Sequence, residues 1–140
     1  EAGRKAGASV VAGGNVSGAD SSYFVQPTVL ANVTPDMSVV REEIFGPVVV
    51  AQRFDDLDEV VAAANDTELG LAASIWTKDL SAMHRLASRV KAGIVWGNCH
   101  ALIDPALPFG GFKQSGLGRE GGRSGIDAYT EEKTVIINLA

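Results

Sequence analysis

The chain has 140 residues, of which 46% are hydrophobic, and this length is enough for one domain around a single core. Its formal net charge is −5, and it has neither a basic stripe nor an apolar run long enough to cross a bilayer, so we expect no nucleic-acid partner and no membrane partner. The only cysteine, Cys99, excludes an internal disulfide and a multi-cysteine metal site, so we expect no metal centre and a reducing, cytoplasmic location.

The first third of the chain predicts short extended segments separated by turns. The opening residues resemble the end of a helix that leads into a strand, so we expect the sequence to continue a longer chain. Pro27 cannot donate a ladder hydrogen bond, which makes the segment around it an edge strand at most. The expected elements are a strand at Ala8–Ala12, a surface loop at Asn15–Ser22, an extended segment at Tyr23–Leu30, and a turn or short helix from Pro35 to about Val40.

Three apolar runs in the middle of the chain predict strands. Val48–Phe54 and Leu71–Trp76 are typical of strands that are buried on both faces, as in a parallel sheet. Ile94–Trp96 predicts a third strand. Helical patterns separate the three runs, so the fold class we expect is α/β, with a β-α-β-α-β portion that forms a parallel sheet through right-handed crossovers.

The two helices between these strands have recognisable boundary signals. Asp56 and Glu59 form a capping-box pattern at the start of the first helix, and Gly70 closes that unit. The second helix is expected over Asp79–Lys91, with Gly93 at the glycine position just beyond its end.

A glycine-rich stretch, Pro108–Glu120 (PFGGFKQSGLGRE), follows the third strand. Phosphate loops need GxxxxGK[ST] or a strand-linked GxGxxG, and neither pattern is present, so phosphate binding is the least favoured interpretation. The alternatives are a mobile loop and a segment whose glycines let the backbone approach a ligand. A helix at about Gly118–Tyr129 follows, and a lone strand at Thr134–Leu139 would be an exposed edge unless a second subunit paired with it.

Two further segments carry groups that could bind a ligand. In EEIFGP, Glu43 could accept hydrogen bonds from sugar hydroxyls and Phe45 could lie against a flat ring, although a solvated acid beside a core Phe is the alternative. Asn98 follows the third strand, at the carboxyl end where ligands gather in open α/β sheets. Cys99 and His100 suggest a nucleophile pair, but neighbours on an extended strand point to opposite faces, which disfavours it.

Five segments together resemble the aldehyde dehydrogenase superfamily, and in its order: EEIFGPV, ANDTELGLAASIWTKD, WGN, PFGGFKQSGLGREGG and AYTEEKTV. The resemblance covers essentially the whole chain. It implies oxidation of a small-molecule aldehyde to a carboxylic acid, with NAD or NADP as the cofactor. It also implies that residues 1–130 are the C-terminal portion of the catalytic domain and that residues 131–140 are an oligomerisation arm, through which a homo-oligomer forms.

On the cofactor side, the resemblance assigns roles to two residues. Glu43 matches the acid that binds the hydroxyls of the nicotinamide ribose, and Phe45 matches the aromatic that positions the nicotinamide ring. The family's nucleophilic cysteine and general-base glutamate have no counterpart in this chain, because Cys99 does not match the nucleophile. We therefore expect the 140 residues alone to be inactive.

On the substrate side, Phe109 matches the aromatic that lines the aldehyde tunnel, and Ala101 and Ile103 fall where that tunnel differs between members. Asn98 is expected to support the site. Glu120 matches a buried acid that helps to relay protons. The glycine-rich stretch would then be a wall of the tunnel.

Three alternatives remain open at this level. The chain could be a stand-alone, inactive module that pairs with full-length subunits, or its parent could pass the acyl group to coenzyme A. The substrate could be an aryl-acetaldehyde, such as phenylacetaldehyde, or betaine aldehyde. The run DPALPF and the apolar residues Leu102, Ile103 and Leu107 favour an apolar aldehyde over a cationic one.

Overall fold

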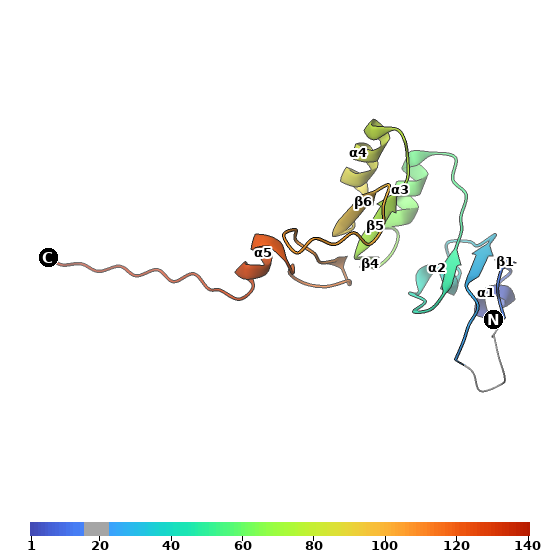
Figure 1. Cartoon of the computed structure of the whole chain (residues 1–140), viewed down its shortest axis with the longest axis horizontal. Helices are drawn as coiled ribbons and strands as arrows, with labels where there is room; N and C mark the ends of the chain where they lie inside the picture. Colours follow the sequence, from blue (N-terminus) through green and yellow to red (C-terminus); the bar gives the residue numbers. More distant parts are fainter. Residues whose placement is uncertain (16–22) are drawn as a thin grey trace. The chain divides into compact units, whose positions relative to one another are not determined.

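The computed structural model describes residues 1–15 and 23–140, so most of the surface loop predicted at Asn15–Ser22 lies outside the described residues. The chain separates into two compact units, Glu1–Glu59 and Val60–Ala140 (Figure 1). None of the helices in the described ranges has both the length and the apolar character that a membrane span needs.

The first unit is built on a small mixed sheet. Strand β2 lies in the centre, antiparallel to β1 and parallel to β3, and the register of β1 shifts between Val10 and Ala12. Leu30 of β2 is buried and contacts the start of the chain, where a Cβ on Gly3 would lie 2.9 Å from the Leu30 side chain. The elements are α1 (Ala2–Lys5), β1 (Ser9–Ala12), β2 (Thr28–Ala31), α2 (Ser38–Arg41) and β3 (Val48–Val50).

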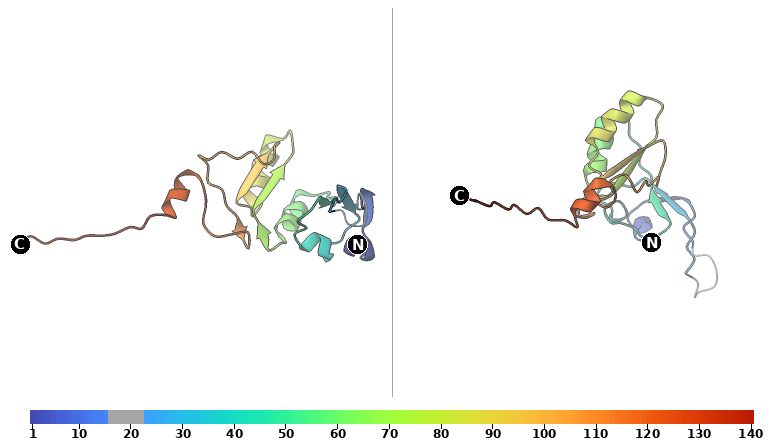
Figure 2. Two further views of the ribbon diagram at one scale, coloured as in Figure 1. Left: turned by 60° about the horizontal axis from the view of Figure 1, so that its bottom comes forward. Right: turned by 60° about the vertical axis from the view of Figure 1, so that its left-hand side comes forward.

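The second unit contains a parallel β-α-β motif. Strands β5 and β6 pair in parallel register from Ala72↔Ile94 to Ile75↔Gly97, and α4 joins them. The ends of α3 and α4 lie side by side, and both helices cover the same face of this strand pair (Figure 2). The elements are α3 (Leu57–Asn65), which begins in the first unit, β4 (Leu69–Gly70), β5 (Ala72–Ile75), α4 (Leu80–Arg89), β6 (Ile94–Gly97), β7 (Phe112–Lys113) and α5 (Gly122–Asp127).

The α/β class with parallel strand pairs is confirmed, and so are the two central helices. Asp79 is the N-cap of α4, as its position predicted, since its carboxylate accepts a hydrogen bond from the Ala82 amide at 3.0 Å. The expectation of one continuous three-stranded sheet is wrong for the described residues. Strand β3 pairs with β2 in the first unit, whereas β5 and β6 form their own pair.

Two strands are also more exposed than their apolar runs predicted. Strand β3 stops at Val50, and Val49 is 57% exposed. A run of this kind needs a packed layer on each face of the sheet. Helices α3 and α4 supply one layer for β5 and β6, which are half-buried along most of their length.

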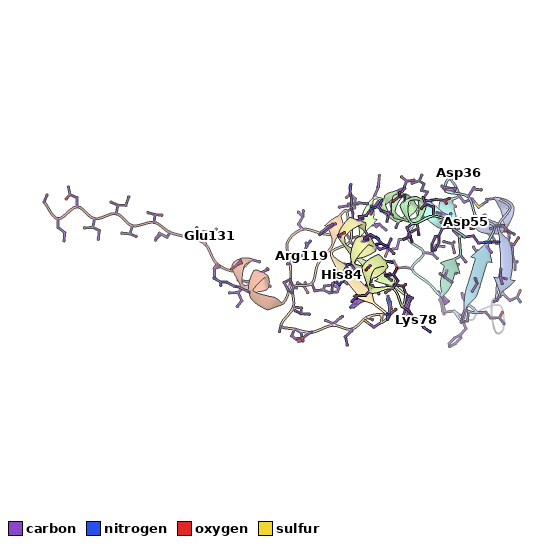
Figure 3. The ribbon with its side chains drawn as sticks, turned by 90° about the horizontal axis from the view of Figure 1, so that it is seen from above. Asp36, Asp55, Lys78, His84, Arg119 and Glu131 are labelled. Carbon is purple, nitrogen blue, oxygen red and sulfur yellow. The ribbon has the colours of Figure 1, made fainter. Side chains whose placement is uncertain are left out.

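The end of the chain contains less regular structure than predicted. The helix expected over Gly118–Tyr129 is shortened to α5, and residues 130–140 form no strand. The backbone there is drawn as an extended trace, with side chains alternating from side to side beyond Glu131 (Figure 3). Ile136 and Leu139 are 89% and 92% exposed. A ladder needs a second strand, and none of the described segments pairs with this one.

The apolar core is small. Among the described residues, the buried apolar side chains are Ala8, Leu30, Val61 and Ala82, and no large side chain is fully buried. Backbone and side-chain hydrogen bonds therefore fix much of the geometry around the candidate site.

Candidate functional site

The glycine-rich stretch forms a loop whose two ends are tied together. The amide of Phe109 donates to the Glu120 carbonyl at 2.7 Å, and the amide of Glu120 donates to the Phe109 carbonyl at 2.7 Å. The loop lines a depression of about 1040 Å³. The structure thus brings together Phe109 and Glu120, two residues that the sequence placed in the site.

The arginine of this loop binds the loop itself. Its Nη1 atom donates to the Gly118 carbonyl at 2.6 Å and to the carbonyl of the buried Gly111 at 3.0 Å. The Arg119 guanidinium also lies 5.3 Å from the centre of the Phe112 ring, within cation–π range. Figure 3 labels Arg119 on the segment between β7 and α5.

The lysine of the loop holds it against the end of α3. Lys113 Nζ donates to the carbonyls of Asn65 and Thr67, at 2.8 Å each. A positive charge at a helix C-terminus is favourable, because the last carbonyls have no partner within the helix. The two cations that suggested a phosphate loop therefore bind carbonyl groups of the chain itself.

The same contact zone includes a short strand pair that the sequence did not predict. Strands β4 and β7 pair antiparallel through Leu69↔Lys113 and Gly70↔Phe112. The Gly70 amide also donates to Ser115 Oγ at 2.9 Å. The loop is consequently a held segment with its own hydrogen bonds, which fits a wall better than a mobile connection.

Glycine is required where this loop passes the start of β6. A Cβ on Gly93 would lie 1.6 Å from the Gly110 carbonyl oxygen, far inside any tolerable contact. The prediction that Gly93 occupies the glycine position beyond α4 is wrong, because α4 ends at Arg89 and its C-cap Val90 is already extended. The glycine is there for close backbone approach.

The segment after β6 contains three of the predicted substrate residues. Ala101 and Ile103 are exposed, and Ala101 has a left-handed φ of 56°. Asn98 is also left-handed, and its carboxamide accepts from the Thr77 amide and donates to the Thr77 carbonyl, both at 2.9 Å. Asn98 thus ties the ends of the strand pair together. Its amide group is engaged with main chain.

Two other side chains hold the same segment. Ser74 Oγ lies 2.8 Å from His100 Nδ1, and Trp96 Nε1 donates to the Leu102 carbonyl at 2.8 Å. The Trp96 and His100 rings meet edge to face, with centroids 5.2 Å apart. Within the described residues Cys99 is a half-buried free thiol, and His100 has Ser74 as its hydrogen-bond partner. This arrangement gives no support to a Cys99–His100 nucleophile pair.

The cofactor candidates lie in the first unit, just before β3. Glu43 is exposed, and its carboxylate makes no hydrogen bond or ion pair with a described residue. It lines a depression of about 510 Å³. Phe45 is 95% exposed, at a turn where the Gly46 amide donates to the Ile44 carbonyl at 2.8 Å. A free carboxylate next to an unpacked aromatic ring has the chemistry to bind a ribose and a flat ring.

One burial expectation fails in this chain. The resemblance implied a buried acid at Glu120, yet Glu120 is exposed, while its main chain is paired with Phe109. The residues that sequence reasoning missed are Ser74, Thr77, Lys113 and Arg119. A basic residue in a glycine-rich stretch does signal a polar contact, but the sequence does not say whether the partner is a ligand or a carbonyl of the chain.

Within residues 1–15 and 23–140, no group of three or more His, Cys, Asp or Glu side chains is arranged to hold a metal ion.

Comparison with known proteins gives a consistent set of matches. The model of the aldehyde dehydrogenase family matches residues 1–135. A betaine aldehyde dehydrogenase of Brucella anthropi is 46% identical over 142 residues, which cover 99% of this chain and 29% of that protein. The NAD+ complex structure of an aldehyde dehydrogenase from Bacillus cereus is 50% identical, with a TM-score of 0.93 over 99% of this chain and 28% of that one.

A third match is the indole-3-acetaldehyde dehydrogenase AldA of P. syringae, solved as a mutant in complex with NAD+ and IAA. It is 44% identical, with a TM-score of 0.92 over 99% of this chain and 28% of that one. The chain thus spans less than a third of the length of the relatives it matches.

Proposed function

The chain belongs to the aldehyde dehydrogenase family, and we propose that the protein of which it is part oxidises an aldehyde to a carboxylic acid with NAD or NADP. The observation that carries this proposal is that one family accounts for both compact units, through residues 1–135. The Bacillus cereus relative was solved with NAD+, which supports a nicotinamide cofactor here.

We assign Glu43 and Phe45 to the nicotinamide half of the cofactor. The Glu43 carboxylate is free to accept hydrogen bonds from ribose hydroxyls, and the exposed Phe45 ring offers apolar area to a flat ring. When bound, the cofactor supplies the hydride acceptor. The contribution of these two residues is orientation, which lowers the entropic part of a barrier.

We assign the aldehyde side to the loop tied by Phe109 and Glu120 and to the segment after β6. Phe109, Ala101 and Ile103 supply apolar contact, Asn98 supports that segment through Thr77, and Glu120 takes part in proton relay. The attacking thiolate and the general base come from outside these 140 residues. The chain alone is therefore inactive, since it lacks the group that forms the covalent bond.

The substrate we propose is an apolar aldehyde of the aryl-acetaldehyde type. Leu102, Ile103 and Leu107 are exposed, and they offer a cation no aromatic cage. The P. syringae relative, named for indole-3-acetaldehyde, supports this class. The Brucella anthropi relative, named for betaine aldehyde, favours the alternative.

We further propose a cytoplasmic homo-oligomer that uses residues 131–140 as its arm. The extended backbone and the exposed Ile136 and Leu139 support a segment that pairs with another subunit. The alternative is a stand-alone module of 140 residues that pairs with full-length subunits. The mass of the native protein separates the two, because a value near 14.6 kDa favours the module.

The test of the catalytic proposal is reduction of NAD or NADP by the purified full protein, followed at the reduced nicotinamide absorbance with phenylacetaldehyde and with betaine aldehyde. Glu43→Gln should raise the KM for the cofactor about tenfold, from the loss of charge-assisted hydrogen bonds. Glu42→Gln, one residue away, is the matched control. Absence of turnover with every aldehyde tried would refute the proposal, and turnover by the 140-residue chain alone would refute its inactivity.

A further inference from the structure

The segment that follows β6 holds an unfavourable backbone conformation. Asn98 and Ala101 both have left-handed φ angles, 53° and 56°, within four residues of chain. Residues other than glycine avoid this region because the Cβ atom crowds the following carbonyl. A loop of this kind keeps one conformation only where neighbouring groups hold it.

Three side-chain contacts hold it, and each reaches a different part of the segment. Asn98 is bound through its carboxamide to the main chain of Thr77. The Trp96 indole holds the other end, at the Leu102 carbonyl. The middle of the segment depends on His100, whose imidazole lies against the edge of Trp96.

The His100 imidazole has one side-chain hydrogen-bond partner among the described residues, and this partner comes from another strand. Ser74 lies in β5, and its hydroxyl oxygen is 2.8 Å from His100 Nδ1. A hydroxyl can either donate to Nδ1 or accept from it, so the contact survives both protonation states of the ring. Ser74 therefore fixes the one residue that lies between the two left-handed positions and the exposed pair Leu102 and Ile103.

The held segment presents an apolar surface. Leu102 and Ile103 are 71% and 62% exposed, although their backbone is anchored on both sides. Binding to such a preformed surface loses less conformational entropy than binding to a loop that must first be ordered. Both features fit a surface that accepts an apolar group.

We propose that Ser74 is a positioning residue that, through His100, holds the 98–103 segment in the conformation that presents Leu102 and Ile103 to an apolar aldehyde. The proposal deepens the proposed function and rests on it for the identity of the ligand. It assigns substrate preference to a hydroxyl on β5 that contacts neither aldehyde nor cofactor. The contact with His100 is a property of the chain itself.

The experiment compares Ser74→Ala, Ser74→Thr and Ser88→Ala in the full protein. Ser88 is the matched control, because its hydroxyl donates to the Arg85 carbonyl at 3.0 Å within α4, away from the segment. The first readout is the ¹⁵N chemical shift of His100 Nδ1. The second is KM and kcat for phenylacetaldehyde and for betaine aldehyde.

For Ser74→Ala we expect the His100 Nδ1 signal to move and the KM for phenylacetaldehyde to rise about three- to tenfold, the factor for one hydrogen bond. The KM for betaine aldehyde and both kcat values should change less than about twofold, since only ground-state contact with the apolar group is lost. Ser74→Thr should restore both readouts, and Ser88→Ala should change neither.

A purely structural role would lower the folded fraction and would affect both aldehydes alike. Equal changes for both substrates, or unchanged KM values with an unchanged His100 signal, would overturn the proposal. If the unsubstituted protein oxidises neither aldehyde, the proposed function fails by itself. The His100 signal then decides whether Ser74 holds the segment, and an unmoved signal in Ser74→Ala overturns that as well.

Discussion

Removing the charge of Lys113 tests whether the glycine-rich loop is held against the end of α3. In Lys113→Met, the side chain keeps its length but the carbonyls of Asn65 and Thr67 lose a donor at 2.8 Å each. An exposed hydrogen bond of this kind contributes at the lower end of about 0.5–1.5 kcal/mol, because water can replace the donor. The favourable charge at the helix end adds about 0.3–1 kcal/mol.

The combined loss of local stability is therefore about 1–2 kcal/mol. The assay is amide hydrogen exchange at two positions in the contact zone. The Gln114 amide donates to the Glu68 carbonyl at 2.9 Å, and the Gly70 amide donates to Ser115 Oγ. Both should exchange about five to thirty times faster in the variant, since local opening becomes that much more frequent.

Lys78→Met is the control for this variant, because it removes an equally exposed lysine (Figure 3) that makes no hydrogen bond or ion pair with a described residue. Exchange at Gln114 and Gly70 should stay unchanged in the control. Unchanged exchange in Lys113→Met as well would refute the reasoning. The loop would then be held by the β4–β7 pairing alone.

Three further predictions concern the backbone, a helix cap and a carboxyl group. Gly93→Ala places a Cβ 1.6 Å from the Gly110 carbonyl oxygen and should destabilise the fold by at least about 3 kcal/mol, seen as loss of soluble protein, whereas Gly46→Ala, with open space around it, should fold normally. Asp79→Ala should lower the free energy of unfolding by about 1 kcal/mol in urea titrations, and Asp79→Asn should retain most of it; equal losses would contradict the capping role. The hydrogen bond from the Thr34 hydroxyl is the main cause that lowers the pKa of Asp36 below its ordinary 3.8, so Thr34→Val should raise this pKa in an NMR titration. Because the folded pKa is depressed, the associated stability is present above pH 3.8 and is lost as the pH falls through the folded value, and the variant should lose less of it there.

The parts of the fold that the sequence predicted are those that depend on neighbours along the chain. Asp79 at the start of α4 and the apolar runs of β5 and β6 carry local signals, and the β5-α4-β6 unit was predicted from them. The partner of β3 was predicted wrongly, because pairing with β2 brings together residues about twenty positions apart and no local pattern encodes that choice. The full burial expected for Val49 failed for a related reason, since it depends on layers elsewhere in the fold.

The candidate site divides in a similar way. The motif pattern placed Phe109 and Glu120 in one loop, and the structure joins their backbones. It did not predict that Lys113 and Arg119 bind main-chain carbonyls, because such a cation serves a bound anion equally well. The roles of Glu43 and Phe45 remain predictions, supported by the free carboxylate and the exposed ring.

The small core has a consequence for how the isolated 140-residue chain should melt. The four buried apolar side chains are small or medium in size, so unfolding uncovers little apolar surface that water does not already reach. The heat-capacity change of unfolding comes mainly from newly exposed apolar area, and the steepness of a urea transition follows the total area exposed. The chain alone should therefore unfold over a broad range of temperature, with a small calorimetric signal. A sharp transition of normal enthalpy should return once further chain or another subunit covers the exposed apolar faces of both units.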